Sequence, residues 1–339
     1  MPMFDLPLSA LESYSPDLPI PDDLVEFWTD TLAEARTHGL ALTREPYENK
    51  LALIDTEDLG YAGFGGSTVR AWLHRPAGAT GPLPTVLHYH GYSGGRGFPH
   101  STTTWAQAGY AHLVMDTRGQ GWNRTAGGPS STADWAPEAG LNSSPGFMTA
   151  GLTDPQHYYY RRVYTDAVRL LDVALALPEV VDSNKIILTG GSQGGGITIA
   201  AAALAALSGI DLAGAAPDVP FLCHFRRAVE LTDAHPYGEI TEYLAGYRDH
   251  AEQAYSTLSY FDGAVLGRLA STPTLFSVAL MDAVCPPSTV YAAYNAYGVD
   301  AADAVTDKQI RVYPHNGHEG GGPYQVDAQL DWFADRFAD

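Results

Sequence analysis

Short apolar segments alternate with longer segments of helical periodicity along most of this 339-residue chain. Residues 68–74 follow the two-residue period of a strand, with Val69, Ala71 and Leu73 on one face. Strands are also predicted over five short apolar segments bounded by turn residues: 85–89, 111–115, 185–189, 274–279 and 309–313. Apolar residues at helical spacing predict helices over 24–35, 158–177, 194–207, 288–297 and 325–337. This alternation predicts an α/β fold, with a mostly parallel sheet covered by helices on both faces.

Three segments depart from this alternation. The proline-rich residues 1–21 are expected to be irregular, and with the helix that follows they form an N-terminal helical extension over 1–50. Residues 122–156 are rich in Gly, Pro, Ser, Thr and Asn and predict a long protruding loop, of a length that usually serves function or an interface. Residues 221–266 are polar and aromatic and are expected to form helical cover over one end of the sheet. We predict a single domain over residues 1–339.

Charge and hydropathy exclude several classes of function. The chain has 19 Lys and Arg against 39 Asp and Glu, a net charge of −20, so it repels phosphate backbones and anionic lipids. We therefore expect neither nucleic acid nor a membrane as partner. The longest apolar run, 199–207, is far shorter than the ~20 residues that span a bilayer. Residues 1–5 lack a basic region followed by an apolar stretch, so we expect no signal peptide and a cytoplasmic location.

The strongest local motif is Gly-x-Ser-x-Gly at residues 190–194, between an apolar strand and an Ala-rich helix. In this context the motif is a nucleophile elbow, where the serine takes strained backbone angles and bulky neighbours would clash. Ser192 is therefore the predicted nucleophile. The Gln193 N–H begins the helix and is predicted to point toward a developing oxyanion. The alternative is a glycine-rich turn that carries a serine by chance.

A serine nucleophile needs a base, and in this fold the acid and the histidine follow it in that order, each after a later strand. Asp282 follows the strand 274–279, and both His315 and His318 follow the strand 309–313. We prefer His318 as base because flanking glycines suit a tight active-site loop, and we assign Asp282 to orient it. Singly, Asp282 could be a helix cap or turn residue and His318 a surface histidine.

The loop after the strand 85–89 is predicted to supply the second oxyanion donor, and the Tyr92 amide is our candidate. Tyr92 and Phe221 are the predicted walls of a small acyl pocket. His88 and His90 would point the same way on a strand and offer half of a zinc site, but no carboxylate or cysteine lies nearby in sequence. We therefore predict no metal.

The two cysteines and a glycine-containing turn at residues 118–120 are further candidates for a metal or phosphate site. The two cysteines, Cys223 and Cys285, are too few for a disulfide framework or a structural zinc site, so both are expected to be reduced and buried. Arg118-Gly119-Gln120 lacks the spacing of a phosphate-binding loop. Arg118 and Gln120 are instead expected to brace the active edge of the sheet through hydrogen bonds.

Three motifs together resemble the signature motifs of the acetyl xylan esterase/cephalosporin-C deacetylase family (carbohydrate esterase family 7): Arg118-Gly119-Gln120, Gly190-Gly191-Ser192-Gln193-Gly194 and His318-Glu319. Further stretches similar to this family are 4–7, 27–28, 90–92, 154–155, 158–161, 220–227 and 281–289. The resemblance covers nearly the whole chain. It implies an α/β-hydrolase fold with the triad Ser192, Asp282 and His318, and oxyanion donors at the Tyr92 and Gln193 amides. It also implies a homo-hexamer whose active sites face an internal cavity.

The expected function is that of a serine esterase. It would remove acetyl groups from small acetylated carbohydrates such as xylo-oligosaccharides, and from cephalosporin C, through an acetyl-enzyme on Ser192 and without a cofactor. The first alternative is a carboxylesterase or peptidase of the same fold with another acyl preference. The second is a non-catalytic binding protein that has kept the fold, which an intact Ser-Asp-His set argues against.

Overall fold

The computed structural model describes residues 3–122, 129–134 and 146–338. In these residues nine strands form one sheet in the order β1-β2-β3-β5-β4-β6-β7-β8-β9. The strands are β1 (Thr43–Tyr47), β2 (Ile54–Ala62), β3 (Thr68–Pro76), β4 (Leu83–Tyr89), β5 (Ala111–Met115), β6 (Val181–Gly191), β7 (Gly214–Asp218), β8 (Thr274–Ala279) and β9 (Lys308–Tyr313). All six predicted strands are present.

The sheet is mostly parallel, as predicted, because β5, β4, β6, β7, β8 and β9 run the same way. Among the first three strands each is antiparallel to its neighbour, and β3 is antiparallel to β5. The carboxyl ends of β4, β6, β8 and β9 therefore meet at one edge of the sheet, where ligands bind in open α/β folds.

The helices are α1 (Leu8–Leu11), α2 (Leu24–Thr37), α3 (Thr104–Gln107), α4 (Tyr159–Leu175), α5 (Gln193–Leu207), α6 (Phe225–Leu231), α7 (Gly238–Gly246), α8 (Ala251–Ser259), α9 (Gly263–Leu266), α10 (Pro287–Ala296) and α11 (Pro323–Ala338). Short 3₁₀ turns are η1 (Phe64–Gly66), η2 (Arg248–His250) and η3 (Gly267–Leu269). The five long predicted helices are confirmed as α2, α4, α5, α10 and α11. In the described part of the chain, no helix combines the length and the apolar character that crossing a membrane requires.

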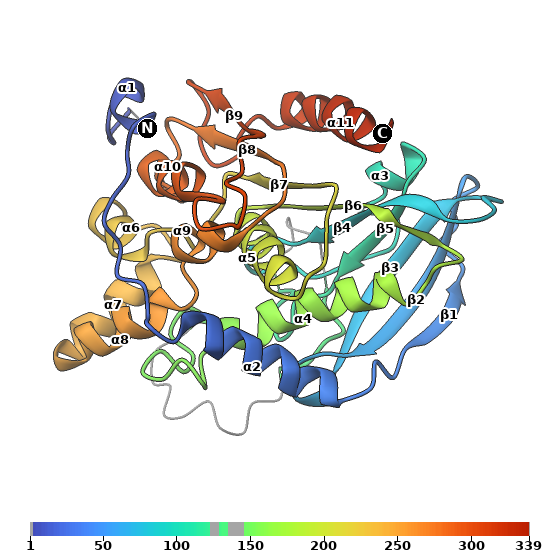
Figure 1. Ribbon diagram of the computed structural model, residues 1–339, viewed down its shortest axis with the longest axis horizontal. Coiled ribbons are helices and arrows are strands. Elements are labelled where there is room, and N and C mark those ends of the chain that lie inside the picture. Colours follow the sequence, from blue (N-terminus) through green and yellow to red (C-terminus); the bar gives the residue numbers. More distant parts are fainter. Residues whose placement is uncertain (1–2, 123–128, 135–145, 339) are drawn as a thin grey trace.

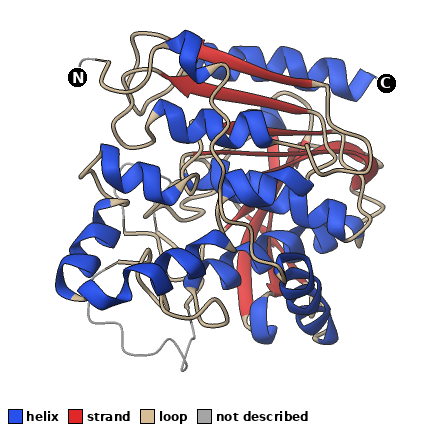
Figure 2. Cartoon of the chain, turned by 60° about the vertical axis from the view of Figure 1, so that its left-hand side comes forward, coloured by secondary structure: helices blue, strands red, loops and turns tan. Residues whose placement is uncertain are grey.

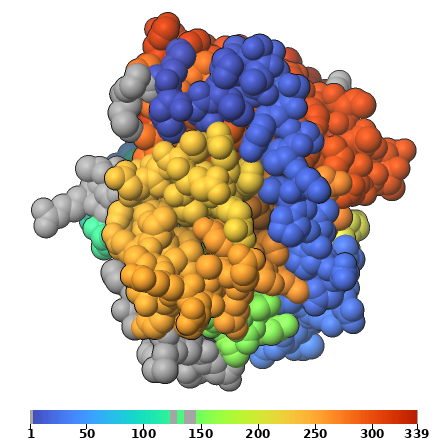
Figure 3. Space-filling model, turned by 90° about the vertical axis from the view of Figure 1, so that its left-hand side faces the viewer, coloured from blue at the N-terminus to red at the C-terminus, as the bar shows by residue number. Residues whose placement is uncertain are grey.

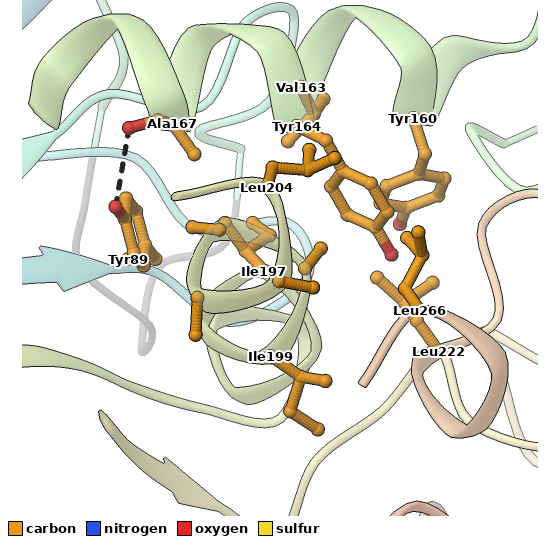
Figure 4. Packing of buried hydrophobic residues seen from close by; sticks show 14 of the residues in the cluster. Tyr89, Tyr160, Val163, Tyr164, Ala167, Ile197, Ile199, Leu204, Leu222 and Leu266 are labelled. Carbon is orange, nitrogen blue, oxygen red and sulfur yellow. Dashed lines mark hydrogen bonds between the residues drawn. The ribbon is translucent and has the colours of Figure 1, made fainter. Parts of the chain in front are cut away.

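Helices cover both faces of the sheet (Figure 1). On one face α5 is buried almost throughout, and most of its residues are Gly or Ala. Figure 4 shows Ile197 and Leu204 of α5 against Val163 and Tyr164 of α4, with Tyr89 nearby donating a hydrogen bond to a carbonyl of α4. On the other face α3 and α11 pack over a second apolar cluster, made by Val86, Trp105, Ile187, Ala216, Leu275, Trp332, Phe333 and Phe337.

The N-terminal extension lies on the outside of the molecule, beside the helices of residues 221–266 (Figure 3). The Asp5 carboxylate accepts hydrogen bonds from the Arg227 side chain and the Ser288 N–H, which join it to α6 and α10. Trp28 of α2 donates to the Tyr260 carbonyl. The expectation of an irregular start needs one small correction, because α1 forms within it where two leucines are half buried or buried.

The predicted helical cover is present as α6 to α9, and α6, α7 and α8 lie together on the side of the molecule away from the antiparallel strands (Figure 1). In Figure 2, which colours helices blue and strands red, most of the helices lie in front of the strands. Of the predicted loop 122–156, residues 123–128 and 135–145 lie outside the described residues. Its described parts, 129–134 and 146–156, contain no helix or strand. Asp134 fixes one of them to the body of the fold through ion pairs with Arg118 and Arg162.

Candidate active site

Ser192 stands at a sharp turn between β6 and α5, with φ 56° and ψ −118°. This left-handed conformation is uncommon outside glycine and presents the side chain at the edge of the sheet. A Cβ at Gly190 would lie 2.6 Å from the Tyr89 carbonyl oxygen, and one at Gly194 would clash with the same oxygen. The two motif glycines are therefore needed for β4 and α5 to approach each other this closely.

The structure brings Ser192, His318 and Asp282 into one hydrogen-bonded chain. His318 Nε2 lies 3.0 Å from Ser192 Oγ, and His318 Nδ1 lies 2.9 Å from Asp282 Oδ2. The Asp282 carboxylate is fully buried, and its Oδ1 accepts the backbone N–H groups of Val284 and Cys285. With the ring proton assigned to Nδ1, where the carboxylate accepts it, Nε2 is free to take the serine proton.

The loop that carries His318 is fastened at both of its ends to one half-buried carboxylate, Asp218 at the end of β7. Tyr313, at the end of β9, donates to Gln325 Oε1 at 2.7 Å. Gln325 Nε2 in turn donates to Asp218 at 2.9 Å, and so does Gln329 Nε2 at 2.9 Å. The Asp218 carbonyl accepts the Ser192 N–H at 2.9 Å. This chain of contacts fixes the base loop relative to the serine.

Burial raises the pKa of Asp218 to about 7, and the hydrogen bonds from Gln325 and Gln329 act in the opposite direction. Because Gln325 Oε1 already accepts from Tyr313, its amide N–H₂ must face Asp218, which favours the ionised carboxylate. Asp218 could not be predicted from the sequence, because it ends a short strand of small residues that carries no clear pattern.

The residues assigned to the oxyanion hole lie close to Ser192. Gln193 is the first residue of α5, and a Cβ at Gly91, next to Tyr92, would lie 3.9 Å from the Ser192 Cβ. The buried Gln193 side chain accepts hydrogen bonds from Gln120 Nε2 and the Tyr160 hydroxyl. Gln120 Oε1 accepts the N–H of the residue after Tyr92.

These contacts confirm that Gln120 braces the active edge of the sheet. Arg118 also takes part, through a bidentate ion pair of 2.6 and 2.7 Å with the buried Asp166 of α4. Asp166 also accepts the Phe64 N–H, so α4, the turn before β3 and the loop after β5 are held together. Such fully paired buried charges fix geometry more than they add stability.

Comparison with known proteins identifies the family. A model of the family described as acetyl xylan esterase (AXE1) matches residues 1–336. The chain belongs to the acetyl xylan esterase family. Its sheet order and strand-to-helix elbow are those of an α/β-hydrolase, as predicted.

Two solved structures of this family are similar along nearly the whole chain. An acetyl xylan esterase from Paenibacillus sp. R4 is 38% identical with a TM-score of 0.87, and the alignment covers 97% of this chain and 99% of that one. Acetyl xylan esterase 1 from Thermoanaerobacterium sp. JW/SL YS485 is 29% identical with a TM-score of 0.86, over 98% and 100% of the two chains. Acetyl esterase Axe7A of Xylanibacter ruminicola is 25% identical over 302 residues, 81% of this chain. The match spans only 60% of that relative's length.

In this member of the acetyl xylan esterase family, the Tyr92 side chain joins three segments that are far apart in sequence. Its hydroxyl donates to Glu239 of α7 at 2.7 Å and accepts the Phe147 N–H at 2.9 Å. Burial, followed by the Glu239 charge, raises the pKa of Tyr92, so the phenol stays protonated. Burial also raises the pKa of Glu239. Glu239 could not be predicted from the sequence, since nothing local connects it to a residue 147 positions away.

Phe221 is fully buried and packs edge-to-face on Tyr92, with ring centroids 6.3 Å apart. The cavity that adjoins Ser192 and His318 has a volume of about 300 Å³ and lies on the side of Asp218, Val219, Ser277 and residues 319–322. Neither Tyr92 nor Phe221 lines it. Their assignment as walls of an acyl pocket stays a prediction.

His88 and His90 do lie close together, and they join two histidines that the sequence did not connect with them. His88 Nδ1 lies 3.3 Å from His112 Nε2, and the ring of His74 lies 5.9 Å from that of His112. Burial lowers the pKa of His74 and His88 to about 4 and of His90 to about 3. All three imidazoles are therefore neutral at pH 7.

Both cysteines are free and buried, as expected. Among the described residues, one set of possible metal ligands has three donor atoms within 4.8 Å of one another: Asp282, Cys285 and His318. This set contains two members of the hydrogen-bonded chain and was not predicted.

The buried histidines predict a stability that falls in acid. Unfolded His74 binds a proton below about pH 6.5, while burial keeps the folded ring neutral until about pH 4. Between these values the unfolded state holds more protons, so acidification lowers the free energy of unfolding, by up to about 3 kcal/mol for this residue. In His74→Gln, which keeps a polar partner beside Thr56, the melting temperature should therefore fall less steeply from pH 7 to 5.

Circular dichroism melts of the two proteins across this range provide the measurement. A carboxylate with a raised pKa, such as Asp218, changes stability with pH in the opposite sense, but it does so in both proteins, so the difference isolates His74. His315→Gln is the matched control, because His315 is exposed and should leave the steepness unchanged. Parallel curves for wild type and His74→Gln would show that this imidazole does not stay neutral on folding.

Proposed function

We propose that the protein is a serine esterase that removes acetyl groups from small acetylated carbohydrates. The observation that carries this proposal is the chain from Ser192 Oγ through His318 to Asp282, with separations of 3.0 and 2.9 Å. Membership of the acetyl xylan esterase family supports the acetyl preference. The names of the two similar structures support the same preference.

In the proposed mechanism, His318 Nε2 accepts the Ser192 proton while Oγ attacks the acetyl carbonyl carbon. The Tyr92 and Gln193 amides stabilise the resulting oxyanion, and Asp282 stabilises the imidazolium. His318 then donates its proton to the sugar oxygen, the C–O bond breaks and an acetyl-enzyme remains. Water, deprotonated by the same imidazole, attacks this ester and releases acetate. No step needs a cofactor.

A substrate panel tests the acyl preference against the alternative of a carboxylesterase or peptidase. We expect rapid turnover of an aryl acetate and of acetylated xylo-oligosaccharides, and we include cephalosporin C among the expected substrates. An aryl butyrate should be slower and an aryl octanoate slower still. Faster turnover of the octanoate, or cleavage of a peptide amide, would favour the alternative.

We also propose that the chain forms a homo-hexamer in the cytoplasm, with active sites that face an internal cavity. The family resemblance and the long loop 122–156 support this assembly, although residues 123–128 and 135–145 lie outside the described residues. If openings to the cavity are narrow, short acetylated xylo-oligosaccharides should be turned over much faster, per acetyl group, than polymeric acetyl-xylan.

Sedimentation velocity tests the assembly, and paired assays on oligomer and polymer test the size selection. A particle of six 36.3 kDa chains is expected. A variant shortened across residues 122–140 should give smaller particles and weaker discrimination. A monomer that deacetylates oligomer and polymer equally would reject the hexamer and the size selection, while the proposed chemistry would stand.

A further inference from the structure

Cys285 lies beside the proposed catalytic residues and has no role in the mechanism. It is fully buried, three residues after Asp282, and its N–H donates to the Asp282 carboxylate at 2.9 Å. Burial raises the pKa of the Cys285 thiol, and a hydrogen bond with the Ser192 side chain acts in the opposite direction.

One donor atom each of Asp282, Cys285 and His318 lies within 4.8 Å of the other two. A thiolate, an imidazole nitrogen and a carboxylate oxygen are the ligands that zinc takes in proteins, at about 2.0–2.3 Å. In the tetrahedral geometry of zinc, two ligands at those bond lengths lie roughly 3.3–3.8 Å apart. The three donor atoms therefore need to move together by at most about 1 Å to hold one ion.

We propose that these three residues form an inhibitory site for a thiophilic divalent cation, zinc or cadmium. Bonds form from the ion to sulfur, nitrogen and oxygen, the ion loses water, and the thiol proton passes to solvent. An ion on His318 Nε2 takes the lone pair that accepts the serine proton. An ion on Nδ1 displaces the ring proton to Nε2, so that Nε2 again cannot accept the serine proton. The predicted inhibition rests on the proposed esterase function, whereas the predicted binding of the cation does not.

Access and selectivity follow from the surroundings. His318 is about one-third exposed and adjoins the 300 Å³ cavity, so an ion can reach the imidazole from that side. Magnesium and calcium prefer sets of oxygen ligands, and here Asp282 is the one oxygen donor of the three, so these ions should not inhibit. Because binding releases the thiol proton, cadmium should bind more tightly as the pH rises.

The experiment is a cadmium titration of the full-length protein that follows two signals. The ultraviolet charge-transfer band of cadmium–thiolate bonds reports binding, and aryl-acetate turnover reports inhibition. We expect one cadmium per chain, loss of turnover in step with the band, and recovery of both properties with EDTA. EDTA alone should leave turnover of the purified protein unchanged, and magnesium should give neither signal.

Cys285→Ser should remove the band and weaken inhibition by at least about tenfold, with Cys285→Ala as a second variant if the first does not fold. Cys223→Ser is the matched control, because Cys223 is also buried but lies outside the three-residue set. It should keep both signals. A band or an inhibition that Cys285→Ser leaves unchanged would overturn the site.

Two further outcomes separate this site from the proposed function. Ser192→Ala should still bind cadmium with the same band, because the serine is not one of the three ligands. A Cys285-dependent band without any loss of turnover would keep the binding site and overturn the inhibition. That result would also count against His318 as the base.

Discussion

Ser192→Ala should fold like the wild type and lose turnover of acetate esters by about 10⁴-fold or more. The substitution removes the one atom that the mechanism requires to attack the acetyl carbon. It leaves the backbone bonds of the elbow intact, because the Ser192 N–H donates to Asp218 and its carbonyl accepts from Phe221. Measured kcat for an aryl acetate, with melting temperatures for both proteins, provides the check.

Labelling with a fluorophosphonate adds a readout that does not depend on substrate choice. The reagent should modify the wild type at Ser192 and leave Ser192→Ala unmodified. Ser259→Ala is a suitable control, since Ser259 is half-buried far from Ser192 in sequence and its hydroxyl donates to the Ser256 carbonyl of its own helix. It should label and turn over like the wild type. An alanine variant that keeps more than about a tenth of the wild-type activity would remove Ser192 from the role of nucleophile.

The strands that the sequence predicted are those with their own apolar pattern, and the three it missed lack one. β1 is mostly exposed, and its Arg44 pairs with Glu57 of β2 at 2.8 Å. β2 carries acidic residues through its first half, and two of them, Glu57 and Asp58, pair with arginines on neighbouring strands. Such a polar segment becomes a strand because it pairs with β3, and that pairing forms only in the tertiary structure.

β7 was missed for a different reason, the small size of its residues. A Cβ at Gly214 would lie 2.5 Å from the Trp332 ring of α11. The strand must therefore be narrow for α5 and α11 to pack closely on its two faces. A run of Gly and Ala gives no hydrophobic signal, although it lies at the centre of the fold.

The three proposed catalytic residues could be predicted from the sequence because, in this fold, each of them lies in the loop or turn that follows a strand. The residues that position them could not, since they come from distant segments. Glu239 reaches Tyr92 from a cover helix, and Asp218 reaches the base loop through Gln325. Cys285 was within the similar stretch 281–289, but its closeness to His318 depends on the folded loops. Local patterns predict elements, while contacts between loops require the tertiary structure.

His318→Ala should lose nearly as much activity as Ser192→Ala, while His315→Ala should stay within about twofold of wild type. Both histidines follow β9, but only His318 bridges Ser192 and Asp282. His315 is exposed, three residues earlier on the same loop. The paired variants thus compare two histidines of one loop under the same assay. The measurement is kcat/KM for an aryl acetate.

The double variant Ser192→Ala/His318→Ala gives the sharpest form of this test. If the two residues act as one unit, the second substitution should cost almost nothing once the first has been made, because the base has no serine proton left to accept. If they act independently, the two losses should multiply. A loss in His315→Ala as deep as that in His318→Ala would assign the base to the other histidine, and the 3.0 Å contact with Ser192 would then need another explanation.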